Sequence, residues 1–149
     1  MYPIVLAVHN IIRWVALILG IIVTVLSFLG WLQNRPWANN ERKFGMYYTS
    51  ALDVQLLLGL ILYLFLSPIA RTALQNLGSM MGNADLRFFG FEHAFYMILA
   101  VVFAHLGSAL PKRAPDERAK YRRAAIWFGL SLLMIILGMP WFRPLLPGF

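Results

Sequence analysis

The sequence of 149 residues contains no cysteine. This absence excludes disulfides, cysteine-ligated zinc, iron–sulfur clusters and thiol catalysis. Charged residues make up only 13% of the chain, compared with about 25% in a typical soluble domain. The sequence also has no phosphate-binding glycine loop and no serine-hydrolase elbow. Several common enzyme classes are therefore excluded before any residue is placed in space.

Apolar residues, in contrast, are abundant. They form 60% of the chain, and the mean hydropathy is +0.69. Such a composition excludes disorder, and a soluble enzyme of this size has too little interior to bury so much apolar surface. The net charge of +7 does not indicate nucleic acid, because the basic residues flank apolar runs. We therefore expect an integral membrane protein whose partner is the lipid bilayer and its headgroups.

The apolar residues fall into long runs that predict transmembrane helices. A bilayer core of about 30 Å requires roughly 20 apolar residues in a helix. No segment alternates apolar and polar residues as a barrel strand does. We expect an all-α integral membrane four-helix bundle in a single domain, residues 1–149. Its helices are predicted at residues 4–32, 47–69, 88–110 and 124–142.

The basic residues predict how the bundle is oriented. The connections at residues 33–45 and 111–123 contain nine Lys and Arg side chains. The opposite end has only three, Arg71, Arg87 and Arg143. Cytoplasmic loops carry the excess of Lys and Arg. We therefore expect a multi-pass protein of a bacterial inner membrane with both termini on the non-cytoplasmic side.

The connection at residues 70–87 has a helical pattern of its own, which predicts a short amphipathic helix lying on the outer interface. An alternative role for Met80 or Met81 is to bind a metal or haem, although methionine more often packs. The apolar residues of the pattern are Ala70, Ala73, Leu74, Leu77, Met80 and Met81.

Ionisable residues at membrane depth are costly and usually functional. The predicted topology divides the six in this chain into two clusters. The outer cluster contains His9, Arg13, Glu92 and His93, and the inner cluster contains Asp53 and His105.

Small and polar residues on the first and third helices share a face with the outer cluster. His9, Arg13 and Gly20 belong to a stripe on the first helix whose members are three or four residues apart. His93 begins a similar stripe on the third helix. Such stripes face the interior of a bundle, where small residues allow close approach. We expect His9 and His93 to face each other from neighbouring helices in one leaflet.

Two facing histidines in a bundle core predict axial ligation of haem iron. Arg13 would then pair with a haem propionate or with Glu92. A purely structural network remains an alternative, with an Arg13–Glu92 ion pair and hydrogen-bonded histidines. Zinc is a weaker alternative, because Glu92 would have to serve as a further ligand and its neighbour His93 points in another direction.

The inner cluster leaves two interpretations open. Asp53 and His105 form either a quinone-headgroup or proton-relay site or a single buried hydrogen bond. The three histidines of the chain cannot supply the four ligands that two bis-histidine haems need. We therefore expect one haem.

Two short strings carry a resemblance to a known family. The string His9-Asn10-Ile11-Ile12-Arg13-Trp14 and the pair Glu92-His93 are similar to segments of small four-helix membrane proteins. In its architecture the chain resembles the bacterial cytochromes b of the cytochrome b561 and superoxide-oxidase type. This resemblance implies haem b and electron transfer to or from quinone. The chain departs from that family in lacking a fourth histidine.

The sequence thus favours a membrane haem b protein that exchanges electrons with quinol or quinone, or with a partner redox subunit. His9 and His93 are the expected iron ligands. Two alternatives remain: a non-catalytic accessory subunit of a membrane complex, and a small proton or solute transporter that uses Asp53, Glu92 and His105. A homodimer is a further expectation for the assembly.

Overall fold

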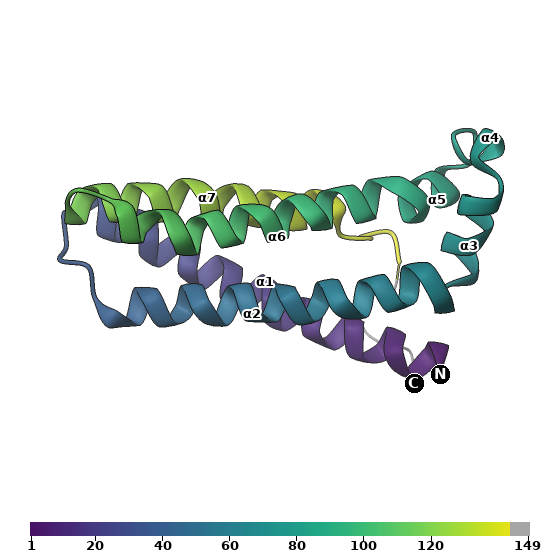
Figure 1. Cartoon of the computed structure of the whole chain (residues 1–149), viewed down its shortest axis with the longest axis horizontal. Coiled ribbons are helices and arrows are strands. Elements are labelled where there is room, and N and C mark those ends of the chain that lie inside the picture. Colours follow the sequence, from purple (N-terminus) through teal and green to yellow (C-terminus); the bar gives the residue numbers. More distant parts are fainter. Residues whose placement is uncertain (144–149) are drawn as a thin grey trace.

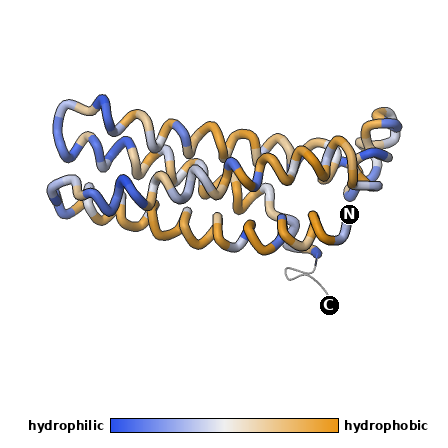
Figure 2. Tube along the Cα trace, turned by 60° about the horizontal axis from the view of Figure 1, so that its bottom comes forward, coloured by the Kyte–Doolittle hydropathy of each residue, from blue (hydrophilic) through white to orange (hydrophobic). Residues whose placement is uncertain are grey.

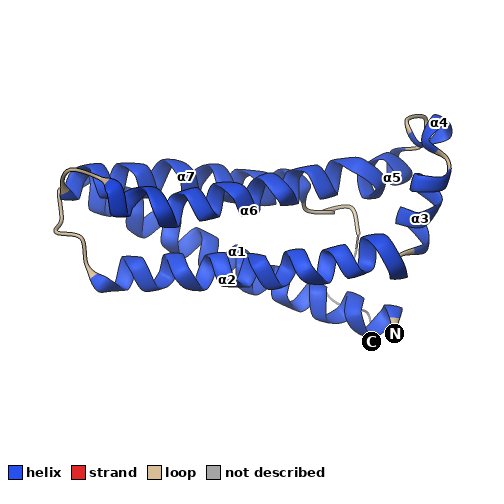
Figure 3. Cartoon of the chain, viewed as in Figure 1, coloured by secondary structure: helices blue, strands red, loops and turns tan. Residues whose placement is uncertain are grey.

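The structure is a computed structural model that describes residues 1–143, and within them every regular element is a helix (Figure 3). The last six residues of the predicted domain at 1–149 lie outside the described part. Four helical spans are long and apolar enough to cross a membrane. Their bounds are Tyr2–Leu32, Asn39–Leu66, Ala84–Arg113 and Glu117–Gly138.

Two of these spans are composite. The second joins α2 (Asn39–Ile61) to a π-helical turn, η1 (Leu62–Leu66). The third runs through α5 (Ala84–Arg87), the π-helical η2 (Phe88–Glu92), α6 (His93–Ala109) and the 3₁₀ turn η3 (Leu110–Arg113). The first and fourth spans are the uninterrupted helices α1 (Tyr2–Leu32) and α7 (Glu117–Gly138).

The helices extend beyond the apolar runs at the basic end of the bundle. α2 begins at Asn39 rather than at residue 47, and α7 begins at Glu117 rather than at residue 124. The extra turns are polar, so hydropathy alone does not reveal them. Asp116 caps α7 by accepting a hydrogen bond from the Ala119 amide at 2.7 Å, which satisfies an otherwise unpaired donor. α7 ends at Gly138, before the predicted residue 142.

The four long helices form an up-and-down bundle (Figure 1). Packing contacts join α1 to α2, α2 to α6, α6 to α7, and α7 back to α1. α1 and α6 are absent from the closely packed pairs, so they lie diagonally across the bundle. This corrects the expectation that the helices carrying His9 and His93 are neighbours, and it places the bundle axis between the two histidines.

A polar contact at the centre of the bundle joins three helices. Tyr48 of α2 and Ser131 of α7 share a hydrogen bond of 2.7 Å, and Ser131 donates to the carbonyl of Ala100 in α6 at 2.6 Å. All three residues are buried. Because lipid supplies no hydrophobic drive for helix association, close packing and such bonds hold the helices together.

The connection between α1 and α2 is tied to the start of α7. Tyr121 donates to the Pro36 carbonyl at 3.0 Å and to Glu41 at 2.9 Å. The Trp37 amide donates to Glu117 at 2.5 Å. Hydrophilic residues gather at this end, whereas apolar residues dominate the length of the helices (Figure 2).

The segment between the second and third spans contains several short helices instead of one. α3 (Pro68–Gln75) is capped by Ser67, and α4 (Leu77–Met80) and α5 follow. Ala70, Ala73 and Met80 are buried, whereas Leu74, Leu77 and Met81 are exposed. Met80 packs over Gly90, where an added Cβ would lie 2.8 Å from its sulfur. The packing of Met80 thus explains its place in the apolar pattern.

Candidate functional site

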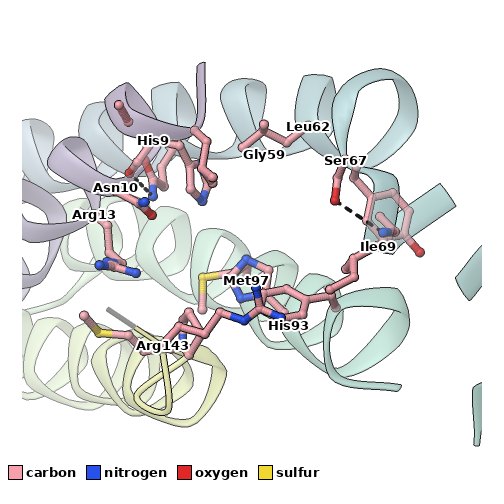
Figure 4. A pocket seen from close by; sticks show the side chains of 18 of the residues that line it. His9, Asn10, Arg13, Gly59, Leu62, Ser67, Ile69, His93, Met97 and Arg143 are labelled. Atoms are coloured by element: carbon pink, nitrogen blue, oxygen red, sulfur yellow. Dashed lines mark hydrogen bonds between the residues drawn. The ribbon is translucent and has the colours of Figure 1, made fainter. Parts of the chain in front are cut away.

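The structure brings His9 of α1 and His93 of α6 together across the bundle axis. Their ring centroids are 6.4 Å apart, and the ring planes are inclined by 67°. The His9 side chain is buried, with a relative exposure of 9%. Both histidines line the same cavity, which they reach from opposite sides (Figure 4).

The end of α7 holds the His93 ring in one tautomer. His93 Nδ1 lies 2.7 Å from the carbonyl oxygen of Gly138. A carbonyl only accepts, so Nδ1 carries the hydrogen and Nε2 keeps its lone pair. This carbonyl is available because the last carbonyls of a helix have no partner within that helix. A hydrogen bond from one imidazole nitrogen to a backbone carbonyl is typical of metal-ligating histidines.

His9 is surrounded by residues of α2. Gln55 Nε2 donates to the backbone carbonyl of His9 at 2.9 Å. A Cβ added to Gly59 would lie 3.4 Å from His9 Cε1. His9 Nδ1 and Gln55 Oε1 are buried and have no hydrogen-bond partner among the described residues. Polar atoms in this state are suited to a bound ligand.

Both histidines line a cavity of about 440 Å³. A smaller, largely apolar cavity of about 220 Å³ continues between α2 and α6. Ligand pockets commonly measure about 300–1,000 Å³. Six residues line both cavities and mark their junction: His9, Gln55, Gly59, Tyr63, His93 and Met97.

The larger cavity carries positive charge. Arg13 and Arg143 are among its lining residues, and within residues 1–143 no acidic side chain lines it. The Arg143 guanidinium lies 4.8 Å from the centroid of the Phe89 ring and contacts Asp85 at 3.3 Å. Arg13 is 8% exposed and projects toward the cavity (Figure 4). Two guanidinium groups therefore line the cavity, and one of them contacts an acidic side chain outside its lining.

Glu92 does not pair with Arg13. Its Oε1 accepts from Arg87 Nε at 2.6 Å. Arg87 directly precedes the π-helical turn η2, and Glu92, five residues later, is the last residue of that turn. In a π-helix residues i and i+5 lie above one another, whereas an α-helix brings i and i+4 together. The predicted Arg13–Glu92 ion pair is therefore wrong, and Glu92 does not line either cavity.

Two π-helical turns shape the mouth of the cavity. Tyr63 lies in η1, and its hydroxyl donates to the carbonyl of Gly90 in η2 at 2.6 Å. The bond joins the second span to the third at the depth of the histidines. Single π-helical turns often occur at functional sites.

Asp53 and His105 also meet, but they lie elsewhere. His105 Nε2 is 2.8 Å from Asp53 Oδ1. Their side chains are 51% and 54% exposed, respectively, so the pair faces outward from the bundle. Neither residue lines the histidine cavities. The prediction of a buried hydrogen bond is thus right about the partners and wrong about the burial.

Sequence reasoning did not identify Gln55, Gly59, Tyr63 or Arg143 as part of the site. Gln55 and Gly59 lie one turn apart on α2 and share a helical face with Leu52 and Leu62, which are buried. Gln55 is a polar residue within an apolar run, and this sequence signal could have identified it. The sequence gives no such signal for Arg143, because the position of Arg143 depends on the turn that follows α7.

A zinc site has no support in the described residues, where no group of three His, Asp or Glu side chains is suited to hold a metal ion. The remaining donor set is a pair of imidazoles. The chain matches no protein-family model, no curated protein and no solved structure. The site geometry and the sequence therefore carry the functional argument.

Proposed function

We propose that the protein binds one haem b between His9 and His93 and exchanges electrons with quinol or quinone, or with a partner redox subunit. The observation that carries this proposal is the spacing of the two rings. Imidazole nitrogens lie about 2 Å from a bound metal, so two imidazoles on one iron have ring centroids about 6 Å apart. The observed separation is 6.4 Å.

Each residue of the site has a role in this proposal. Haem supplies one-electron redox chemistry when it is bound. His93, fixed by Gly138, would present Nε2 as a ligand, and His9 would supply the second imidazole. Arg13 and Arg143, which line the cavity, would neutralise the carboxylates of the haem. Gly59 keeps space beside the His9 ring.

The proposal includes an orientation in the membrane. Nine basic side chains belong to the connections at one end of the bundle, and the N-terminus lies at the other end (Figure 1), where Arg143 lines the same cavity as Tyr2. The positive-inside rule then puts both termini outside the cytoplasm of a bacterial inner membrane. The site lies near the outer face, and α3 lies along the outer interface.

The alternatives receive less support. The structural alternative relied on an Arg13–Glu92 ion pair, but Glu92 contacts Arg87 instead. The transporter alternative needs Asp53, Glu92 and His105 along one path. Asp53 and His105 face outward, and none of the three lines either cavity between the histidines.

An absorption spectrum of the purified, dithionite-reduced protein tests the proposal. We expect a haem b α-band in the wild type, and we expect it to shift or disappear in His93→Ala. His105→Ala is the matched control, because it removes a histidine that lies outside the cavity, and its spectrum should equal that of the wild type.

Insertion of each variant into the membrane is measured in the same preparations. A wild-type protein that purifies colourless from cells with ample haem contradicts the proposal. So does an unchanged α-band in His93→Ala.

A further inference from the structure

The outward-facing pair of Asp53 and His105 is not explained by haem binding. Asp53 lies six residues inside the apolar run that begins at residue 47, and His105 lies five residues before the end of the apolar run at residues 88–110. Both side chains are about half exposed, 51% for Asp53 and 54% for His105. Ionisable residues at such depth nearly always face a bundle interior or a water-filled cavity. In an isolated copy of this chain, the pair would face lipid.

We propose that this pair lies at the centre of an interface between two copies of the chain. Within residues 1–143, each side chain makes one hydrogen bond, to the other. Together the two groups carry no net charge when they share two protons. They then retain one donor, His105 Nδ1–H, and one acceptor, Asp53 Oδ2. Lipid tails satisfy neither group.

A second copy supplies both missing partners at once. Two copies inserted in the same direction are related by a two-fold axis along the membrane normal, so equivalent residues meet at equal depth. His105 of one copy then donates to Asp53 of the other, and the reverse bond forms by symmetry. The result is a closed ring of four side chains. An unrelated helix would need a matching acid and base at the same depth.

The surface around the pair is suited to close contact. On both α2 and α6, exposed residues recur every three or four positions, so the outward face that contains Asp53 and His105 continues along the two helices. Small residues allow helices to approach closely in membranes. Ser50 lies one turn from Asp53, and Ala109 lies one turn from His105. The neighbouring face is apolar, and its exposed members are Met46, Leu57, Ile98 and Val102.

Exchange of the two residues tests the inference. Asp53→His alone places only imidazoles in the ring, and His105→Asp alone places only carboxylates. Each single variant should dimerise at least about tenfold more weakly in lipid bilayers, because two interhelical polar bonds of the strength seen in membranes are lost. The double variant restores one acid and one base in each copy. It should recover the dimer.

The absence of cysteine allows an independent measurement in native membranes. Ala109→Cys lies on the proposed face, and Leu32→Cys lies at the same end of the bundle on the exposed face of α1 as the matched control. We expect a short bismaleimide to link two copies at position 109 and not at position 32. Equal linkage at both positions overturns the inference.

Further outcomes of these experiments would also overturn the proposed dimer. A wild-type monomer, whether free or bound to a lipid, a quinone or a different protein at this face, overturns the proposal, as do single variants that dimerise like the wild type. The haem proposal is tested separately, because the residues changed in these experiments, Asp53, His105 and Ala109, line neither histidine cavity.

Discussion

At the scale of single residues, the two histidines differ in how firmly they are held. His93 is fixed by a hydrogen bond to Gly138, whereas His9 Nδ1 has no partner among the described residues. The His9 ring is positioned by packing, with Gly59 beside it. The orientation of the His9 ring therefore depends on the space that Gly59 leaves.

Gly59→Leu should weaken haem binding without removing a ligand. The new side chain would enter the cavity beside His9 Cε1, where a Cβ lies at 3.4 Å. We expect the dissociation constant, measured from the reduced α-band in a haem titration, to rise at least about tenfold, because overpacking costs about 1–3 kcal/mol and one 1.4 kcal/mol step is tenfold in binding. Gly78→Leu is the control, since a Cβ there meets nothing within 4 Å. An unchanged dissociation constant in Gly59→Leu would contradict the placement of the ligand.

The sequence predicted the residues of the histidine pair but not all their partners. Stripes of small and polar residues place His9 and His93 on inward faces, because helical periodicity is local. The pairing of Glu92 with Arg87 depends on a π-helical turn. Such a turn is an insertion in hydrogen-bond register that no simple periodicity reveals.

At the scale of elements, the seam between α1 and α7 shows how glycine sets the distance between helices. Gly30 of α1 faces the ring of Tyr121, and an added Cβ there would overlap that ring. The ring cannot move easily, because its hydroxyl is bonded to Pro36 and Glu41 and the side chain is fully buried. Gly129 of α7 faces the same seam, but its Cβ would make ordinary contact with Phe28 at 3.6 Å.

Gly30→Ala and Gly129→Ala should therefore have opposite effects on stability. Alanine favours a helix by about 1 kcal/mol over glycine. At Gly129 this gain remains, so we expect unchanged or slightly higher stability. At Gly30 the overlap dominates, and we expect a net loss of about 1–3 kcal/mol. The free energy of unfolding of both variants is measured in mixed micelles. Equal stability of the two variants would contradict this account of the contact between α1 and α7.

At the scale of the whole molecule, the charge asymmetry predicts the orientation of the bundle. Gln33 lies at the basic end, and Gln75 ends α3 at the opposite end. Both side chains are exposed. Because the chain has no cysteine, a single introduced thiol gives an unambiguous position.

Gln75→Cys should react with a membrane-impermeant maleimide in intact spheroplasts, and Gln33→Cys should react only after lysis. The expected result follows from the positive-inside rule, which keeps the basic connections in the cytoplasm. Labelling of both variants in lysed cells is the control for thiol reactivity. The reverse pattern would place the histidine site near the cytoplasmic face.

The sequence by itself determined that the chain is helical and that residues 1–143 hold four candidate membrane spans. Hydropathy along a helix is a property of consecutive residues, so it can be read without the fold. Polar helix ends, such as residues 39–43 of α2, were missed because they lie outside the apolar runs.

Only the tertiary structure decided which helices are neighbours and which polar groups are covered. The diagonal placement of α1 and α6 creates the cavity, and it depends on packing among all four long helices. Asp53 and His105 lie at the same depth and are hydrogen-bonded to each other. Their exposure depends on which face of the α2–α6 pair points away from the bundle. Depth follows from position along the chain, whereas the direction a side chain faces depends on contacts between segments far apart in sequence.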